Sequence, residues 1–295
     1  MGKSLFSAKH IQSEDAARAY IERLRWPKGP ICPHCSEKKI YRLNVKNTTR
    51  KLFKCAKCRK QFTVTVGTIF EDSHIPLTMW LQAIQMYCSS KKGFSAHQLH
   101  RMLGITYKSA WFLAHRIRHA MAQPIFPDKL GGIVEVDETF IGSKADQDES
   151  KSKAHLATVV SLVERGGRVR SLIMPKVTAN NLKDMIRAHV ESSSKLMTDS
   201  FNLYKGLNKE FASHDRVNHY RKEWVRGEAH TNTVEGYFSL LKRGLAGTYH
   251  HVSKQHLHRY LAEFDFRYSS RKEDDVMRSV LAVKGTEGKR LQYQN

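Results

Sequence analysis

The segment Gly132–Gly142 reads GIVEVDETFIG, and the second half of the chain is organised around it. Apolar and polar residues alternate along it, which predicts a β-strand bounded by the two glycines. The apolar side of this predicted strand holds Val134, Val136 and Phe140. The opposite side holds Glu135, Asp137 and Thr139. Glu138 interrupts the apolar side.

The carboxylates on this strand allow two interpretations. Burying an unpaired carboxylate is costly, so this side of the strand needs solvent, a cation or a hydrogen-bond network. One interpretation is an edge strand with a solvated face. The other is that Asp137 is a metal ligand on the central strand of a nuclease-like sheet, and residues far downstream are needed to decide.

The sequence after this strand predicts a mixed α/β sheet. Residues 155–177 form two strands joined by a turn at Arg165-Gly166-Gly167, a good hairpin signal. Residues 180–190 predict a helix, and residues 195–200 predict a strand that ends near Asp199. The order β-β-β-α-β, with one carboxylate on the first strand and another at the end of the fourth, is that of a ribonuclease-H-like sheet. Taken alone, Asp199 is also typical of a turn or a helix N-cap.

A third element downstream is the helix predicted over residues 230–245, HTNTVEGYFSLLKRGL. At spacings of three, four and three, one of its faces carries Asn232, Glu235, Ser239 and Lys242. The opposite, apolar stripe carries Val234, Phe238 and Leu241. The alternative interpretation is an exposed amphipathic helix with an incidental polar face.

Two CxxC motifs near the N-terminus predict a metal site. Nineteen residues separate the first pair from the second, and the four thiols are Cys32, Cys35, Cys55 and Cys58. This spacing fits a tetrahedral zinc site, and a reducing compartment disfavours disulfides. His34 lies inside a motif, but four thiolates already fill the site.

Basic residues crowd this predicted zinc ribbon. Residues 37–60 hold ten Lys and Arg against the single acidic residue Glu37, with aromatic residues interleaved, so phosphate contact is favoured over a merely solvated face. The candidate DNA-contacting residues here are Lys51, Lys54, Lys57, Arg59 and Lys60. The following segment, residues 61–70, predicts a strand that closes the ribbon.

Residues 76–121 predict three helices, the last two in helix-turn-helix layout. Ser95 and Gln98 form a capping-box pattern, Gly104 allows the turn, and Thr106 can cap the last helix. We expect Leu99, Met102 and Leu103 on one face, and Trp111 and Phe112 in the core. A plain helical hairpin is the alternative to a recognition helix that contacts DNA through Thr106, Tyr107 and Lys108.

Composition and charge limit the classes of protein to which the chain can belong. The chain has 295 residues and a formal net charge of +22, which predicts a polyanionic partner, with nucleic acid as the first candidate. No run approaches the roughly 20 apolar residues of a membrane span, and the first ten residues lack the apolar core of a signal peptide. We therefore expect a cytoplasmic, nucleoid-associated protein with no membrane partner.

With these residues assembled, the chain resembles the zinc-ribbon insertion-sequence transposases with an ISXO-type DDE domain. The resemblance runs from about Ser13 to about Ser270. Its most specific pieces are VEVDETFIG (134–142), TDSFNLYKGL (198–207) and residues 230–269. It implies a ribonuclease-H-like core and divalent-metal-dependent cleavage and joining of DNA strands. It also implies a homodimer or larger complex that brings two DNA ends together.

The resemblance also suggests roles for individual residues. Asp137 and Asp199 match the first two catalytic carboxylates, which would bind Mg²⁺ or Mn²⁺. The third position is Asn232 followed by Lys242 in this group, whereas Glu235 has the spacing to Lys242 that many DDE enzymes use. A carboxylate also holds a cation better than an amide does. Both stay open, and Arg243 is a further candidate for DNA contact.

These predictions divide the chain into five parts. They are an N-terminal helix (1–28), a zinc ribbon (29–72), a helix-turn-helix domain (73–122), a ribonuclease-H-like transposase domain (130–272) and a C-terminal tail (273–295). The expected function is a transposase that binds the terminal inverted repeats of its element. A DNA-binding regulator with an inactive nuclease-like domain is the alternative.

Overall fold

The computed structural model describes residues 7–43, 51–122, 128–142 and 156–291. The chain forms two compact units. Unit 1 combines Met1–Ile125 with Glu273–Asn295, and unit 2 is Phe126–Lys272. Unit 2 is therefore inserted between two segments of unit 1. Within the described residues, no helix is both long and apolar enough to cross a membrane.

Unit 1 begins with the short helix α1 (Lys9–Gln12) and the helix α2 (Glu14–Arg25). The N-terminal helix predicted within residues 1–28 corresponds to α2, whose N-cap residue, Ser13, makes no side-chain capping hydrogen bond. Instead, the Glu14 carboxylate accepts hydrogen bonds from the backbone N–H and the hydroxyl of Thr78. Glu14 thereby ties α2 to the start of the next helix in the unit.

A three-stranded antiparallel ribbon follows, built from β1 (Ile40–Leu43), β2 (Leu52–Cys55) and β3 (Gln61–Phe62). The strand predicted over residues 61–70 is wrong beyond Phe62. Residues 63–69 turn instead: the Thr63 and Thr65 hydroxyls lie 2.7 Å apart, and the Thr68 N–H donates to the Thr65 carbonyl. Hydroxyl side chains that bond locally compete in this way with a strand ladder.

The three helices predicted after the ribbon are confirmed: α3 (Leu77–Ser89), α4 (Ala96–Leu103) and α5 (Tyr107–Met121). Ser95 and Gln98 form both bonds of the capping box, and Gly104 has the left-handed backbone that the turn requires. The Thr106 side chain accepts from the Ser109 N–H and caps α5. The sequence therefore predicted this helix-turn-helix nearly residue by residue.

One side-chain prediction in this region is wrong, that Trp111 and Phe112 lie in the core. On α4, Leu99 and Leu103 are buried, whereas Met102 is 56% exposed. Trp111 and Phe112 are only half-buried, whereas the core side of α5 is formed by smaller residues such as Ala110 and Leu113.

The C-terminal segment, for which the sequence suggested only a tail, contains helix α10 (Asp275–Lys284), and this helix completes unit 1. The Ser279 hydroxyl donates to Gln85 of α3 at 2.8 Å, and Arg278 donates to the Cys88 carbonyl at 2.6 Å. Thr68 and Glu287 form a β-bridge just beyond. Both ends of the chain thus contribute to one core.

Unit 2 contains a five-stranded mixed sheet in the order β6-β5-β4-β7-β8. The strands are β4 (Ile133–Ile141), β5 (Ala157–Glu164), β6 (Val169–Ile173), β7 (Lys195–Asp199) and β8 (Ser213–Val217). The opening strand is the central one, so the edge-strand interpretation is excluded. It pairs antiparallel with β5 and parallel with β7, as a ribonuclease-H-like sheet requires, whereas β8 was not predicted.

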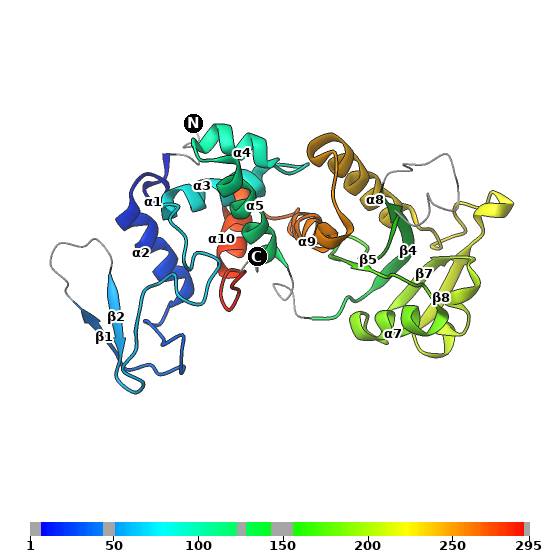
Figure 1. Ribbon diagram of the computed structural model, residues 1–295. Coiled ribbons are helices and arrows are strands. Elements are labelled where there is room, and N and C mark those ends of the chain that lie inside the picture. The colour runs from blue at the N-terminus through cyan, green and yellow to red at the C-terminus, as the bar shows by residue number, and fades with distance from the viewer. Residues whose placement is uncertain (1–6, 44–50, 123–127, 143–155, 292–295) are drawn as a thin grey trace. The chain divides into compact units, whose positions relative to one another are not determined.

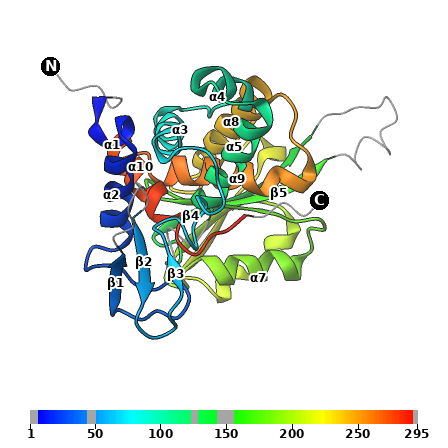
Figure 2. The same cartoon turned by 60° about the vertical axis from the view of Figure 1, so that its left-hand side comes forward.

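Helices cover both faces of this sheet (Figures 1 and 2). The helix α7 (Ala179–His189) packs on the face to which Val134 and Val136 point. The helices α8 (Asn232–Gly244) and α9 (Lys254–Ser269) pack on the other face, which carries Val159 and Val163. Phe140, predicted on the apolar side, is 59% exposed because it lies near the end of β4, outside both cores.

Asp265 of α9 joins three elements of unit 2. Its carboxylate accepts hydrogen bonds from the N–H and the hydroxyl of Ser171 on β6, each at 2.7 Å, and from the Tyr237 hydroxyl of α8. Burial raises the pKa of the Asp265 carboxyl to about 6, although these hydrogen bonds and Arg170 oppose the shift.

We expect this carboxyl to make the stability of unit 2 depend on pH. Its pKa rises from an ordinary 3.8 to about 6 on folding, so the folded state binds the proton more tightly. The stabilisation is complete below about pH 4 and is lost as the pH rises through 6, by about 3 kcal/mol in all. The check is urea unfolding of the wild type and of Asp265→Asn, whose amide does not titrate. A difference between the two that is constant from pH 4 to 7 would contradict this assignment.

Candidate active site and zinc ribbon

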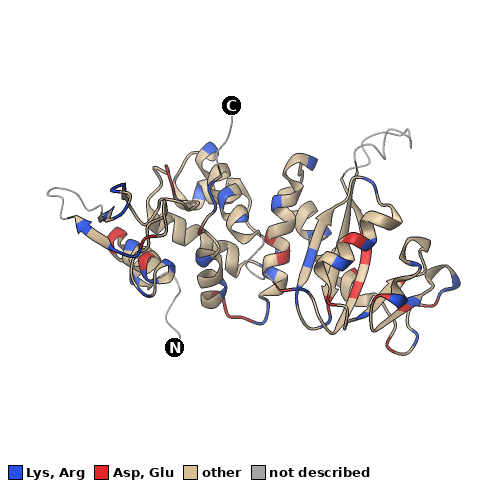
Figure 3. Ribbon diagram, turned by 90° about the horizontal axis from the view of Figure 1, so that it is seen from below, with Lys and Arg blue, Asp and Glu red and all other residues tan. Residues whose placement is uncertain are grey.

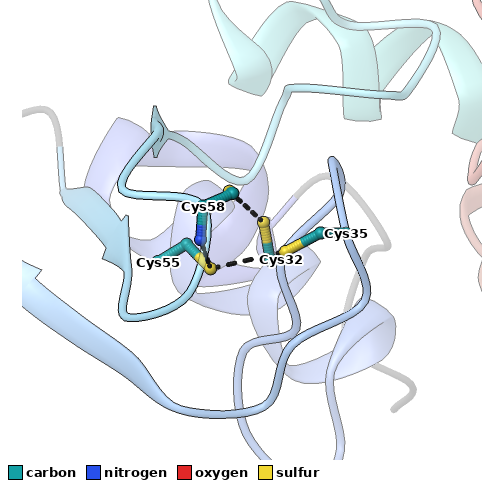
Figure 4. Close-up of side chains that lie close together, drawn as sticks. All are labelled: Cys32, Cys35, Cys55 and Cys58. Atoms are coloured by element: carbon teal, nitrogen blue, oxygen red, sulfur yellow. Dashed lines mark hydrogen bonds between the residues drawn. The ribbon is translucent and has the colours of Figure 1, made fainter.

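The four cysteines meet at one point of unit 1 (Figure 4). Their Sγ atoms all lie within 4.8 Å of one another. The Cys32 and Cys58 sulfurs are 3.7 Å apart, and those of Cys35 and Cys55 are 3.5 Å apart. Sulfurs at the corners of a zinc tetrahedron, with Zn–S about 2.3 Å, are about 3.8 Å apart. This donor set therefore fits Zn²⁺, as predicted.

Aromatic packing attaches this site to the rest of unit 1. The Trp26 ring, at the end of α2, meets the Phe53 and Phe62 rings edge-on at 5.5 and 6.0 Å between centroids. His34 packs edge-on against Phe62 at 6.4 Å. The ribbon has few buried residues of its own, so its fold depends on the metal and on this aromatic cluster.

We expect Cys32→Ser to release the zinc and to unfold the ribbon. A small domain with so little core loses most of its folding free energy with its metal. The measurements are zinc content and the affinity for a duplex carrying the element end, with Cys88→Ser as the matched control, because Cys88 is a buried thiol of α3 outside the site. Unchanged zinc content and affinity in Cys32→Ser would contradict a structural zinc site.

The predicted DNA-contacting residues of unit 1 lie at its surface. Thr106, Tyr107 and Lys108 are exposed at the start of α5. On the ribbon, the exposed basic residues are Lys51, Lys57, Arg59 and Lys60, and Lys54 is half-buried. None of these Lys and Arg side chains is ion-paired with a described residue, so all are available to phosphate. Figure 3 shows basic residues on elements of both units.

In unit 2 the register of the sheet aligns the two predicted aspartates. The parallel pairing of β4 with β7 matches Val136 with Thr198, and the residues that follow are Asp137 and Asp199. The two aspartates therefore occupy equivalent positions on adjacent strands, which lie about 4.8 Å apart. Both point to the α8 side, since Val136 of the preceding pair faces the α7 core.

Glu138 is a further carboxylate, next to Asp137, and no role was predicted for it from the sequence. It follows Asp137 on β4, and its Oε2 atom accepts a hydrogen bond from the buried Tyr204 hydroxyl at 2.6 Å. Burial raises the pKa of Glu138, and the charge of Asp199 raises it further. The signal in the sequence was the interruption of the apolar side of the strand.

Negative charge is crowded around Asp137 at this end of β4. Burial raises the pKa of the Asp137 carboxyl to about 7, against the hydrogen bond that it accepts from the Glu138 N–H. The charges of Glu138, Asp199 and Glu235 raise the pKa of Asp137 further. Carboxylate oxygens are the donors that Mg²⁺ prefers, and a divalent ion would offset this repulsion. Among the described residues, no three carboxylates lie as close to one another as the four cysteines do.

Helix α8 forms the opposite wall of the site. A pocket of about 500 Å³ lies between β4 and α8. Its lining residues are Asp137, Glu138, Thr139, Glu235, Phe238, Ser239, Lys242 and Arg243. The structure thus places Asp137 with Glu235 and Lys242, which were candidates for this site, and with Arg243, which was a candidate for DNA contact. Asn232 is exposed at the first turn of α8, and neither it nor Asp199 is among the described residues that line the pocket.

Glu235 is held in place from the loop before α8. The Thr231 hydroxyl donates to Glu235 Oε1 at 2.8 Å, and the His219 Nε2 atom lies 3.8 Å from the same oxygen. The apolar stripe predicted on α8 is confirmed, because Val234, Phe238 and Leu241 are all buried. Its polar face, including Glu235 and Lys242, is exposed.

Glu135, two residues before Asp137, anchors α8 to the central strand. Its side chain is fully buried, and its carboxylate accepts hydrogen bonds from the Thr233 N–H (2.7 Å), the Thr233 hydroxyl (2.8 Å) and the Val234 N–H (3.0 Å). These are unpaired donors of the first helical turn, where negative charge is also favoured. Arg165, from the β5–β6 turn, donates to Glu135 at 2.6 Å. The sequence placed Glu135 on the polar side but did not reveal this role, because its partners lie 30 to 99 residues away.

Two family descriptions match the chain. Residues 129–269 match the ISXO2-like transposase domain, and residues 12–61 match the transposase zinc-ribbon domain. Together the two matches indicate an insertion-sequence transposase. The chain belongs to the ISXO2-like, zinc-ribbon transposase family, and its transposase domain has the ribonuclease-H-like fold.

Two relatives support this assignment. The chain is 28% identical over 276 residues to an uncharacterized protein in transposable element ISH50 of Halobacterium salinarum, covering 88% of this chain and 92% of the relative. It is 27% identical over 103 residues to an uncharacterized transposase-like protein of Haemophilus influenzae, covering 35% of this chain and 82% of the relative.

Proposed function

We propose that the protein is the transposase that moves its own insertion sequence. In this proposal the zinc ribbon and the helix-turn-helix bind double-stranded DNA at the terminal inverted repeats. The transposase domain then cleaves the element ends and joins them to target DNA. The observation that carries the proposal is the pairing of β4 with β7, which sets Asp137 beside Asp199, with Glu235 across the pocket.

The donor set suits the chemistry of phosphodiester transfer. A pair of divalent ions, Mg²⁺ or Mn²⁺, would lower the pKa of the attacking hydroxyl and stabilise the leaving oxygen. Asp137 and Asp199 would hold them, and Glu235 is the third ligand that the pocket favours over Asn232, because the Glu235 carboxylate faces Asp137 and carries charge. Glu138 is close enough to add to the negative field.

Basic residues at the pocket would bind the substrate. Lys242 and Arg243 line the same pocket as Asp137, Glu138 and Glu235, and their charges favour a DNA phosphate next to the ion-binding oxygens. This arrangement supports a transposase over a DNA-binding regulator with an inactive nuclease-like domain. We further propose that the protein acts as a homodimer or larger complex, because two DNA ends must be brought together.

The test is an assay with purified protein and duplexes that carry the two ends of the native element. We expect strand cleavage and transfer that require added Mg²⁺ or Mn²⁺ and that stop when these ions are left out. Binding of the ends should persist without them, since the zinc ribbon and helix-turn-helix are separate from the carboxylate pocket and the zinc is not removed. Sequence-specific binding with no cleavage in either metal would favour the regulator.

A further inference from the structure

A second cavity, apart from the carboxylate pocket, lies at the end of strands β7 and β8. It has a volume of about 480 Å³ and is lined by Ser200, Arg216, Asn218, Arg221, Glu223 and Arg226. Arg226 is partly engaged, since it donates to the Arg216 carbonyl at 2.9 Å and lies 3.9 Å from Glu223. Arg216 and Arg221 have no ion-pair partner among the described residues. Three guanidinium groups against one carboxylate make this a site for an anion.

The loop that forms this cavity also displays large aromatic side chains. We call residues 218–226, which follow β8 and include the 3₁₀ turn η4 (His219–Arg221), the basic–aromatic loop. Tyr220 is 98% exposed and Trp224 is 55% exposed. Three charged residues, two basic and one acidic, lie between them in the segment YRKEW. Tyr, Trp and Arg are enriched both in protein–protein interfaces and on surfaces that bind single-stranded nucleic acid, and the arginine cavity beside these rings favours the second.

The basic–aromatic loop is joined to the carboxylate site at two places. Ser200 follows Asp199, and Asn218 follows Val217, which pairs with Asp199 in the parallel register of β7 and β8. The cavity therefore opens at the same sheet edge as Asp199, on the side away from β4. The Trp224 ring packs against the His219 ring at a tilt of 40°, with the centroids 4.8 Å apart. His219 Nε2 lies 3.3 Å from the Thr231 hydroxyl that donates to Glu235.

We propose that the basic–aromatic loop binds unpaired nucleotides of the DNA strand beside the cleavage site. The arginine cavity holds a backbone phosphate, and the bases stack on Tyr220 and Trp224. Stacking on a protein ring requires a base that has left its duplex, whereas paired bases offer the loop only phosphates. This inference rests on the proposed function, because it assigns the loop to the same DNA.

The test compares two duplexes of the element end, one blunt and one with a short single-stranded overhang at the cleavage position. The overhang carries 2-aminopurine, whose fluorescence is quenched when it stacks. We expect the full-length wild type to bind the overhang DNA more tightly and to quench the probe. Tyr220→Ala combined with Trp224→Ala should weaken overhang binding about tenfold or more and abolish quenching, with blunt-duplex binding unchanged. Arg216→Ala combined with Arg221→Ala should weaken overhang binding and flatten its salt dependence.

Matched controls separate this role from general effects of charge and apolar surface. Phe140→Ala removes an aromatic ring that is also highly exposed, and Lys176→Ala with Lys209→Ala removes two exposed positive charges elsewhere in unit 2. Both should behave as the wild type. Unchanged overhang binding in the double aromatic variant would overturn the proposal, and so would a loss of self-association without a change in DNA binding. The binding measurement is made without added Mg²⁺ or Mn²⁺ and needs no cleavage, so a wild type that fails to cleave in the separate Mg²⁺ assay would count against the proposed function alone.

Discussion

Asp137→Asn and Asp199→Asn should each lower metal-dependent cleavage of the element ends by at least about a thousandfold. Each change replaces a charged ligand with a neutral amide at a place where the charge is needed to hold a divalent ion. Binding of the ends should stay at the wild-type level, because the ribbon and helix-turn-helix are untouched. The measurements are single-turnover cleavage in Mg²⁺ and gel-shift affinity on the same duplex.

A matched control for these variants is Asp215→Asn. Asp215 is an exposed aspartate of β8, in the same sheet but outside the carboxylate pocket, so its loss should leave the cleavage rate within about twofold, as for most surface changes. If either active-site variant cleaves at a rate close to that of Asp215→Asn, the assignment of the metal ligands is wrong.

The same assay separates the two candidates for the third ligand. Glu235→Gln should reduce cleavage as severely as the aspartate variants, because Glu235 lines the pocket and its charge acts on Asp137. Asn232→Ala should have a smaller effect. The reverse order would assign the third position to Asn232, as the resemblance to the family first suggested.

Glu135→Ala should lower the free energy of unfolding of unit 2 by about 3 to 5 kcal/mol. The change leaves Arg165 without its buried partner and leaves the Thr233 and Val234 N–H groups without an acceptor. It should also slow cleavage, since α8 carries Glu235 and Lys242 and loses its anchor to the central strand. Calorimetry should show a fall of about 10 °C in the transition of unit 2.

Two further variants test the anchor itself. Glu135→Gln keeps an acceptor for the helix N–H groups but removes the charge, so its stability should lie between the wild type and Glu135→Ala. Glu228→Ala removes a glutamate whose pair with Lys195 is exposed, and this should cost less than about 1 kcal/mol. Equal losses in Glu135→Ala and Glu228→Ala would rule out an anchoring role.

The parts of the fold that follow from local patterns were predictable. Alternation gave the central strand, the Arg165-Gly166-Gly167 turn gave the hairpin, and cap residues such as Ser95 and Thr106 gave the helix boundaries. The two CxxC motifs gave the metal site because tetrahedral thiolate coordination leaves little geometric freedom. These features depend on residues within about ten positions of one another, or on four ligands whose tetrahedral geometry allows a single arrangement.

The features that were missed depend on tertiary contacts. Strand β8, SHDRV, carries mostly polar residues and forms only because β7 offers it an edge. Glu138 accepts a hydrogen bond from Tyr204, and Glu135 accepts hydrogen bonds from the start of α8. Both partners are distant in sequence, so neither contact could be predicted. The strand predicted beyond Phe62 does not form, because its threonines make local hydrogen bonds instead of pairing with a neighbouring strand.

The insertion of unit 2 between α5 and α10 has a genetic consequence. A stop codon shortly after codon 272 would spare every residue proposed for catalysis, yet it would delete the helix that packs on α3 and bonds to Gln85 and Cys88. Such a product would have a damaged unit 1, the unit that carries the zinc ribbon, although the ribbon is encoded at the opposite end of the gene. Element copies truncated in this way would encode a transposase domain that has lost its means of finding the element.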